Sequence, residues 1–376
     1  MKRLAILTRP GLLAFGLVLG VNFLHAQAPG FFTVVPTPNE NFDNGLIAAS
    51  ASSASDIWAV GQSTIHFNGT SWTAFQAPLI RGDNTGTLGG VVDISPTLAW
   101  AVGTVTQGPN QVIERWNGTE WTQFPNPSFP PHNTPELFAM TSISANDIWA
   151  VGDVNVEGLR LDSLFEHWNG STWTVVTLNT GGAPILSGAS SHAANDVWAV
   201  GYNFGGPKTT LAEHWNGQNW STVATVNVGN GDNQFNNVLA LASNNVWAVG
   251  ASTPEANAPT LTLIEHFDGA RWTVVPSPNM GTASNRLFGI TAISPTNIYA
   301  FGSYFAENGS GNQMTLLLHW NGVNWTVAPS PDPTNRNFLS DILWAGVVPS
   351  PGNIWIFGDE DATETLAIHA TVGGGS

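Results

Sequence analysis

One short word recurs seven times along the chain, and this periodicity restricts the folds open to it. The word is an aromatic residue followed by Ala-Val-Gly or a near variant, and it begins at Trp58, Trp100, Trp149, Trp198, Trp247, Tyr299 and Trp355. A second word, close to His-Trp-Asn-Gly-x-x-Trp-Thr, follows each of the first six. Spacings of 42 to 56 residues are typical of β-propeller blades, in which each repeat forms a four-stranded sheet.

The missing part of the seventh repeat stands at the other end of the chain. That repeat stops after Ile368-His369, whereas residues 32–39 match residues 272–279, part of the fifth repeat, in six of eight positions. Such a circular offset suits a closed ring, in which one blade contains both ends of the chain. We therefore predict an all-β fold: a seven-bladed β-propeller of four-stranded antiparallel blades, closed by an N-terminal strand that completes the last blade.

Loop lengths separate the two faces of this predicted ring. In the third repeat the pattern predicts strands at 137–144, 148–153, 163–168 and 173–177, with a tight hairpin at Asn169-Gly170. Because consecutive strands run up and down, the second-to-third loops and the blade connections share one face, which we call the loop face. The segment from the glycine of the first word to the His or Arg of the second is 5 to 17 residues long, depending on the repeat. Since variable loops on a rigid scaffold carry function, we expect a ligand there.

Composition excludes several kinds of partner and chemistry. The chain has 10 Lys+Arg, 26 Asp+Glu and no cysteine, for a net charge of −16. Without cysteine it can form no disulfide, thiolate nucleophile or Cys-ligated metal site. The acidic balance disfavours nucleic acid and anionic membranes, because both require a basic surface.

The first 28 residues have the features of a secretion signal. Lys2, Arg3 and Arg9 precede and flank an apolar stretch at 11–24, and cleavage after Ala26 is the site we favour. We therefore expect residues 1–28 to be a signal peptide and residues 29–376 to form the propeller. Removal of the signal leaves 7 basic and 26 acidic residues, a charge of −19, in a protein that is secreted or periplasmic, in the cell envelope. No further membrane insertion is expected.

Most tryptophans and histidines are predicted to be structural. Sixteen of 17 Trp occupy three repeat positions, which indicates packing between blades, and only Trp344 stands outside the pattern. Six histidines repeat once per blade, and we expect each to pair within its blade with an Asp or Asn that precedes the first word: His66, His167, His214, His266, His319 and His369. His132 and His192 have no partner that the sequence identifies.

Polar residues in the predicted loop-face connections are the candidate ligand contacts. They are Arg81, Asp83, Asn133, Asp232, Asn233, Asn285, Arg286, Asn335 and Arg336. A recurring Asn-x-apolar pattern (Asn233-Phe235, Asn285-Leu287) indicates that at least half of them serve loop structure.

An acidic stretch in the last repeat is a weak candidate for a metal site. Asp359, Asp361 and Glu364 offer the oxygen ligands that calcium prefers, but they lack the EF-hand spacing and glycine, so we favour a solvated acidic loop. The sequence therefore leaves calcium binding as an open alternative, and no other cofactor is predicted.

The repeated words also carry a family resemblance. Asn-Asp-Ile-Trp-Ala-Val-Gly at 146–152 and Glu-His-Trp-Asn-Gly-Ser-Thr-Trp-Thr at 166–174 resemble secreted bacterial β-propellers that are grouped loosely with kelch and Asp-box repeats. The chain differs from kelch in lacking a double glycine after the second strand. It differs from the Asp-box in having Asn-Gly four residues before Trp. The resemblance implies the fold and implies no particular activity.

These observations favour a secreted, non-catalytic binding scaffold. Its variable loops would contact a protein or an extracellular polysaccharide. The alternative is a carbohydrate-active enzyme, a glycoside hydrolase or lyase, with carboxylates that converge on the same face. A structural envelope component is a third interpretation. No GxSxG, HExxH or Walker A motif is present, and the sequence does not determine the oligomeric state.

Overall fold

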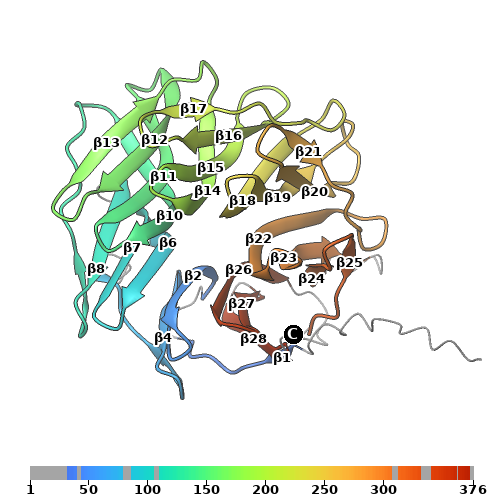
Figure 1. Cartoon of the computed structure of the whole chain (residues 1–376), viewed down its shortest axis with the longest axis horizontal. Helices are drawn as coiled ribbons and strands as arrows, with labels where there is room; N and C mark the ends of the chain where they lie inside the picture. The colour runs from blue at the N-terminus through green and yellow to red at the C-terminus, as the bar shows by residue number, and fades with distance from the viewer. Residues whose placement is uncertain are drawn as a thin grey trace, which may run out of the picture.

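The computed structural model describes residues 32–39, 44–78, 86–105, 110–306, 312–331, 340–361 and 363–372. These residues form seven four-stranded antiparallel sheets, arranged as blades around a central axis (Figure 1). The predicted seven-bladed β-propeller is therefore confirmed. None of the described residues belongs to a helix that could cross a membrane. The predicted signal peptide lies outside the described residues.

Each blade starts at the axis and runs outward. The innermost strands are β2 (Leu46–Ser53), β6 (Gly86–Ser95), β10 (Thr134–Ser144), β14 (Pro184–Ala193), β18 (Asn233–Ala242), β22 (Asn285–Ser294) and β26 (Asp341–Ser350). The second strands carry the first repeated word: β3 (Asp56–Gly61), β7 (Leu98–Val105), β11 (Asp147–Val156), β15 (Asp196–Asn203), β19 (Asn245–Ser252), β23 (Asn297–Phe305) and β27 (Asn353–Glu360).

The outer half of each blade is a hairpin that carries the second word. Its third strands are β4 (Thr64–Phe67), β8 (Gln111–Trp116), β12 (Arg160–Trp168), β16 (Thr209–Trp215), β20 (Leu261–Phe267), β24 (Gln313–Trp320) and β28 (Glu364–Thr371). The outermost strands are β5 (Trp72–Ala74), β9 (Trp121–Gln123), β13 (Trp173–Leu178), β17 (Trp220–Thr222), β21 (Trp272–Val274), β25 (Trp325–Val327) and, for the last blade, β1 (Thr33–Val34).

The N-terminal strand closes the ring as the sequence predicts. β1 pairs antiparallel with β28, with Thr33 opposite His369 and Val34 opposite Ile368. The Val35 amide extends this pairing by donating to the carbonyl of Ala367 at 2.8 Å. Figure 1 shows β1 beside β28, near the C-terminus. The seventh blade is thus built from both ends of the chain.

A β-bulge in the innermost strand explains why the first word ends in glycine. In the third blade the register between β10 and β11 shifts between Leu137 and Ala139, so Phe138 is an extra residue. Gly152 sits at this bulge, where a Cβ atom would lie 1.9 Å from the carbonyl oxygen of Glu136. At the equivalent glycine of every blade, a Cβ atom would lie 1.7 to 2.0 Å from a backbone carbonyl oxygen. Only glycine permits this close approach of the two strands.

The repeated tryptophans pack between blades. In the third blade Trp149 stacks on His167, with ring centroids 4.2 Å apart. It also meets Trp215 and Trp220 of the fourth blade at 5.0 and 5.3 Å. Each such ring removes a large apolar surface from water. The prediction that these tryptophans are core residues is confirmed.

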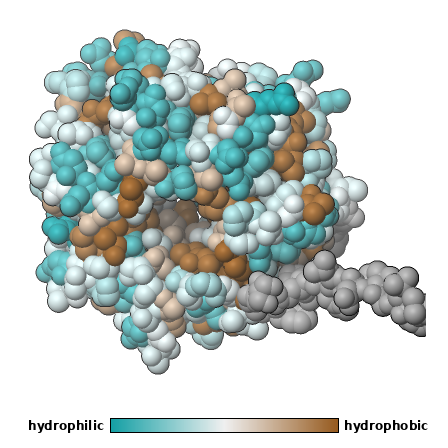
Figure 2. Space-filling view, viewed as in Figure 1, coloured by the Kyte–Doolittle hydropathy of each residue, from teal (hydrophilic) through white to brown (hydrophobic). Residues whose placement is uncertain are grey.

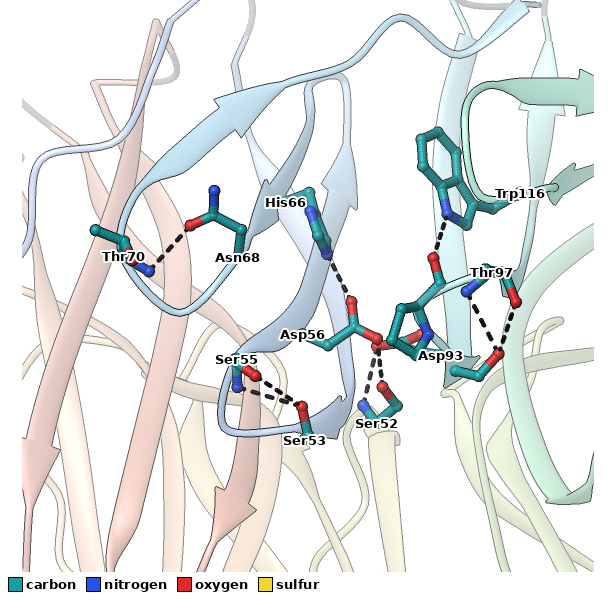
Figure 3. A network of polar contacts seen from close by, with 12 residues as sticks. Ser52, Ser53, Ser55, Asp56, His66, Asn68, Thr70, Asp93, Thr97 and Trp116 are labelled. Carbon is teal, nitrogen blue, oxygen red and sulfur yellow. Dashed lines mark hydrogen bonds and ion pairs between the residues drawn. The ribbon is translucent and has the colours of Figure 1, made fainter.

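The repeated histidines pair within their blades, also as predicted. His66 Nε2 lies 2.6 Å from Asp56 Oδ1 (Figure 3), and His167 Nε2 lies 2.8 Å from Asp147 Oδ1. In the other four pairs the distances are 2.7 to 2.9 Å. They are His214–Asp196, His266–Asn245, His319–Asn297 and His369–Asn353. These residues fasten the ends of the second and third strands on the face opposite the loop face, which we call the hairpin face.

Candidate functional site

A cavity of about 610 Å³ lies on the propeller axis, between the innermost strands of all seven blades. Figure 2 shows the hollow at the centre of one face, with hydrophobic residues around it. A volume of this size is in the range of small-molecule sites. The cavity is the concave feature of the described chain to which every blade contributes.

The β-bulges supply much of the lining. In each blade the residue before the bulge is a fully buried Leu or Phe, and the bulge residue that follows it lines the cavity. The buried residue hardly changes between blades, whereas the bulge residue changes at almost every one. In blade order the bulge residues are Ile47, Gly89, Phe138, Ser187, Asn236, Phe288 and Trp344.

One wall of the cavity is aromatic. Phe288 and Trp344, from the sixth and seventh blades, lie with ring centroids 4.2 Å apart. The Trp344 Nε1–H donates to Asp359 Oδ2 at 2.6 Å, which fixes the orientation of the indole. Both rings are half-buried, so part of each is open to the cavity, unlike the first-word tryptophans of the core. Trp344 is the one tryptophan that the repeat pattern does not explain.

Polar groups from the fifth blade stand on the lining as well. Asn236 donates from Nδ2 to the Leu287 carbonyl at 2.7 Å and accepts from Gln234 Nε2 at 2.9 Å. Lys208, in the neighbouring loop, donates to Gln234 Oε1 at 2.9 Å, and its Nζ lies 4.4 Å from the ring centroid of Tyr202. A chain of contacts therefore joins the loop face to the cavity wall.

The cavity itself is uncharged. Among the described residues that line it, none has an ionisable side chain. This contrasts with the net charge of −16 for the whole chain. The acidic groups lie around the cavity and on the surface instead.

Two carboxylates stand directly opposite each other at the loop-face end of the third blade. Glu136 of β10 and Asp153 of β11 are register partners, an arrangement that brings like charges close. Burial, and secondarily the charge of Glu136, raises the pKa of Asp153 to about 7. Burial and then the charge of Asp153 raise the pKa of Tyr202 on the next blade. Two neighbouring carboxyls are one of the features that a carbohydrate-active enzyme would need.

The predicted loop residues divide into two groups. Asn233 and Asn285 are buried, and their side chains bind the backbone of the preceding connection, for example Val228 N at 2.9 Å and Met280 N at 2.8 Å. We therefore assign both a structural role. Asp232 and Arg286 are exposed in the loop-face region, and Asn133 is partly buried there.

Asn133 and Asp232 each tie a connection to a neighbouring second-to-third loop. Asn133 Oδ1 accepts from Glu157 N at 3.3 Å, and Asp232 Oδ1 accepts from Lys208 N at 2.9 Å. Arg286 is exposed beside the mouth. The remaining candidates lie outside the described residues: Arg81, Asp83, Asn335 and Arg336.

The three weak metal candidates have different environments. Asp359 is buried and bound to the Trp344 indole, Asp361 is exposed with a φ of 59°, and Glu364 is exposed at the start of β28. Within the described residues no three His, Cys, Asp or Glu side chains are arranged to hold a metal ion.

Sequence reasoning missed the bulge residues, Asp153 and Tyr202. A signal was present, because a variable position follows the repeated Leu or Phe of each innermost strand, and another follows the glycine of each first word. Neither could be identified as a lining or mouth position without knowledge of the bulge. Trp344 was recognised as exceptional, and its place in the cavity explains why.

Comparison with known proteins finds similarity in structure alone. No protein-family model matches the chain, and no curated protein matches its sequence. YCF48 bound to a D1 peptide is similar over 92% of this chain and 99% of that one, with a TM-score of 0.58 and 13% identity. An ulvan lyase, from a family of polysaccharide lyases, has a TM-score of 0.59 and 11% identity over 90% and 96% of the two chains.

A third similar structure is a xyloglucanase from Xanthomonas campestris. Its TM-score is 0.54 and its identity 12%, over 90% of this chain and 53% of that one. At such identities the similarity establishes the propeller fold and leaves the function to the residues of this chain.

Proposed function

We propose that the protein is a secreted, non-catalytic binding module that recognises a protein or an extracellular polysaccharide at the loop face and the mouth of the axial cavity. The observation that carries the proposal is the variation at the bulge position. Seven blades repeat the same frame, yet the residue that each bulge presents to the cavity ranges from glycine to tryptophan. A purely structural ring has no need of such variation. The similar propellers include one bound to a peptide and others that act on polysaccharides, so both ligand classes suit the fold.

Exposed apolar side chains on the second-to-third loops also favour the loop face as the binding surface. Leu159 is 80% exposed in the third blade and Phe204 is 58% exposed in the fourth. Both side chains are therefore accessible to a partner that docks on the loop face. The hairpin face offers a matched control in Val323, which is 81% exposed in the hairpin between β24 and β25.

The test is retention of residues 27–376 on immobilised polysaccharides, together with affinity capture of proteins from the native envelope. Both are run with and without calcium, because Asp359, Asp361 and Glu364 are the weak candidates for binding that ion. We expect Leu159→Asp and Phe204→Asp to weaken saturable binding by about tenfold, whereas Val323→Asp leaves it unchanged. Binding that is lost only in Val323→Asp, or no saturable binding to any partner, would refute the proposal.

A second candidate function rests on Asp153 and Glu136. A glycoside hydrolase uses two carboxyls, one of them with a raised pKa, and here Asp153 would be the general acid and Glu136 its partner. Turnover of a polysaccharide in the same panel, lost in Asp153→Asn with binding retained, would support the enzyme and exclude the non-catalytic module.

A further inference from the structure

The uncharged character of the axial cavity restricts what it can hold. An anionic ligand would lose its hydration on entry and find no cation among the described lining residues, and a cationic ligand would find no carboxylate. The net charge of −16 also repels polyanions from the mouth. The occupant is therefore neutral, at least in the part that enters.

The aromatic wall is preorganised for a flat apolar face. Trp344 is held by its hydrogen bond to Asp359 and by its contact with Phe288, so neither ring has to be immobilised when a ligand arrives. The indole N–H is already used, and the two rings are in contact at an angle of 42°, so the ring surface left outside that contact is what the wall offers a ligand. A ligand that stacks on them needs an apolar face and gains contact area without offering a polar partner.

The same cavity contains polar groups that lack partners. Thr291 lines it on β22 and is only 8% exposed, yet its hydroxyl makes no hydrogen bond in the protein. Asn237 on β18 accepts from the Val238 amide at 2.8 Å, and its side-chain nitrogen donates to no protein group. Both groups lie at the cavity wall with hydrogen-bonding capacity that no protein group uses, so they can pair with a hydroxyl of a ligand.

We propose that this cavity binds a neutral sugar residue, stacked on Phe288 and Trp344 and hydrogen-bonded to Thr291 and Asn237. A sugar ring presents C–H groups on its faces and uncharged hydroxyls at its edge, which matches both walls at once. An aliphatic or aromatic side chain of a protein would fill the apolar wall but leave the Thr291 hydroxyl unpaired. The inference rests on the proposed binding function and narrows its ligand to a neutral polysaccharide.

The test uses residues 27–376 and calorimetric titration with the hexasaccharides of β-1,4-glucose, β-1,3-glucose, β-1,4-mannose and β-1,4-xylose. Polygalacturonate oligomers serve as an anionic comparison. We expect at least one neutral oligomer to bind and the anionic one not to bind. Trp344→Ala and Phe288→Ala should each weaken binding by about tenfold, because each removes half of the stacking surface.

Two further variants keep the test independent of folding. Thr291→Val has nearly the same shape and removes only the hydroxyl, so it should fold normally and weaken binding by about fivefold. Val323→Ala, on the hairpin face, should change nothing. Neutral sugar binding with unchanged affinity in Trp344→Ala and Thr291→Val overturns the cavity site.

The outcomes also separate this inference from the proposed function. Binding of a protein or a polyanion at the loop face, with no neutral sugar bound, overturns the inference and leaves the binding module standing. Absence of any saturable ligand removes both.

Discussion

At the scale of single residues, the repeated glycine of the first word controls the geometry of the cavity. Gly152 allows Glu136 to approach within van der Waals contact, and this approach accompanies the bulge that turns Phe138 toward the axis. The glycine therefore affects the cavity indirectly. It contacts no ligand, but the lining residue depends on it.

Gly152→Ala should destabilise the protein by on the order of 3 kcal/mol, because the new Cβ would overlap a backbone oxygen that cannot move away. The measurement is the free energy of unfolding in urea. Gly158→Asn is the matched control, since Gly158 has a φ of 71° in open space and Asn tolerates that conformation. Equal stability of Gly152→Ala and the unaltered protein would disprove the steric explanation.

At the scale of elements, the short strand β1 has an effect out of proportion to its length. It covers the edge of β28 in a blade that otherwise has only three strands. An uncovered strand edge can pair with another chain, and natural sheets avoid exposing one.

Deletion of residues 29–40 should therefore lower Tm by on the order of 10 °C and promote aggregation. Size-exclusion chromatography and thermal unfolding measure the two effects. A synthetic peptide of residues 29–40, added in trans, should restore part of the loss by adding its strand to β28. A truncated chain that stays monomeric with an unchanged Tm would contradict the role of β1 in ring closure.

At the scale of the whole molecule, buried carboxyls lie within and between the blades. The third strands of four blades carry a fully buried glutamate where the other three carry Ile65, Leu318 or Ile368. Burial is the main cause that raises the pKa of Glu166, Glu213 and Glu265 to about 7. Burial, with the charge of Asp56, raises the pKa of Asp93 to about 8 (Figure 3).

A carboxyl with a raised pKa binds its proton more tightly in the folded state. Its contribution to stability is complete below the unfolded pKa, near 4, and is lost as the pH rises through the folded value. The partly buried histidines His266, His319 and His369 have pKa values lowered by desolvation, so they act in the opposite direction, mainly below about pH 6.5.

We therefore expect Tm to fall by on the order of 5 °C between pH 6.5 and pH 8, where only the carboxyls titrate. Glu213→Gln should flatten this profile by about 1 kcal/mol, because the amide can still accept from Ser163 Oγ and does not ionise. Glu255→Gln, at an exposed position, is the control. A Tm that is constant or rises over this interval would contradict the assignment.

Much of the fold followed from periodicity, and less of the site did. Repetition predicted the blade number, the ring closure, the core tryptophans and the His–Asp and His–Asn pairs, and each is confirmed. At the loop face, the first three predicted strands of the third blade were three residues short and the fourth was one residue short, because the residues at those ends carry no repeated word. Among the candidate loop residues, the sequence could not distinguish Asn233 and Asn285, which are buried and bind the backbone of a loop, from Asp232, which is exposed.

The sequence by itself determined how the blades pack, since a pattern repeated seven times must satisfy the same interface seven times. Only the tertiary structure decided which side chains reach the axis. A one-residue bulge changes the direction of a side chain without any change in composition. The site is also assembled from single residues of separate blades, such as Phe288 and Trp344, 56 positions apart in the chain. Their proximity follows from the packing of the sixth blade against the seventh together with the bulge in each innermost strand.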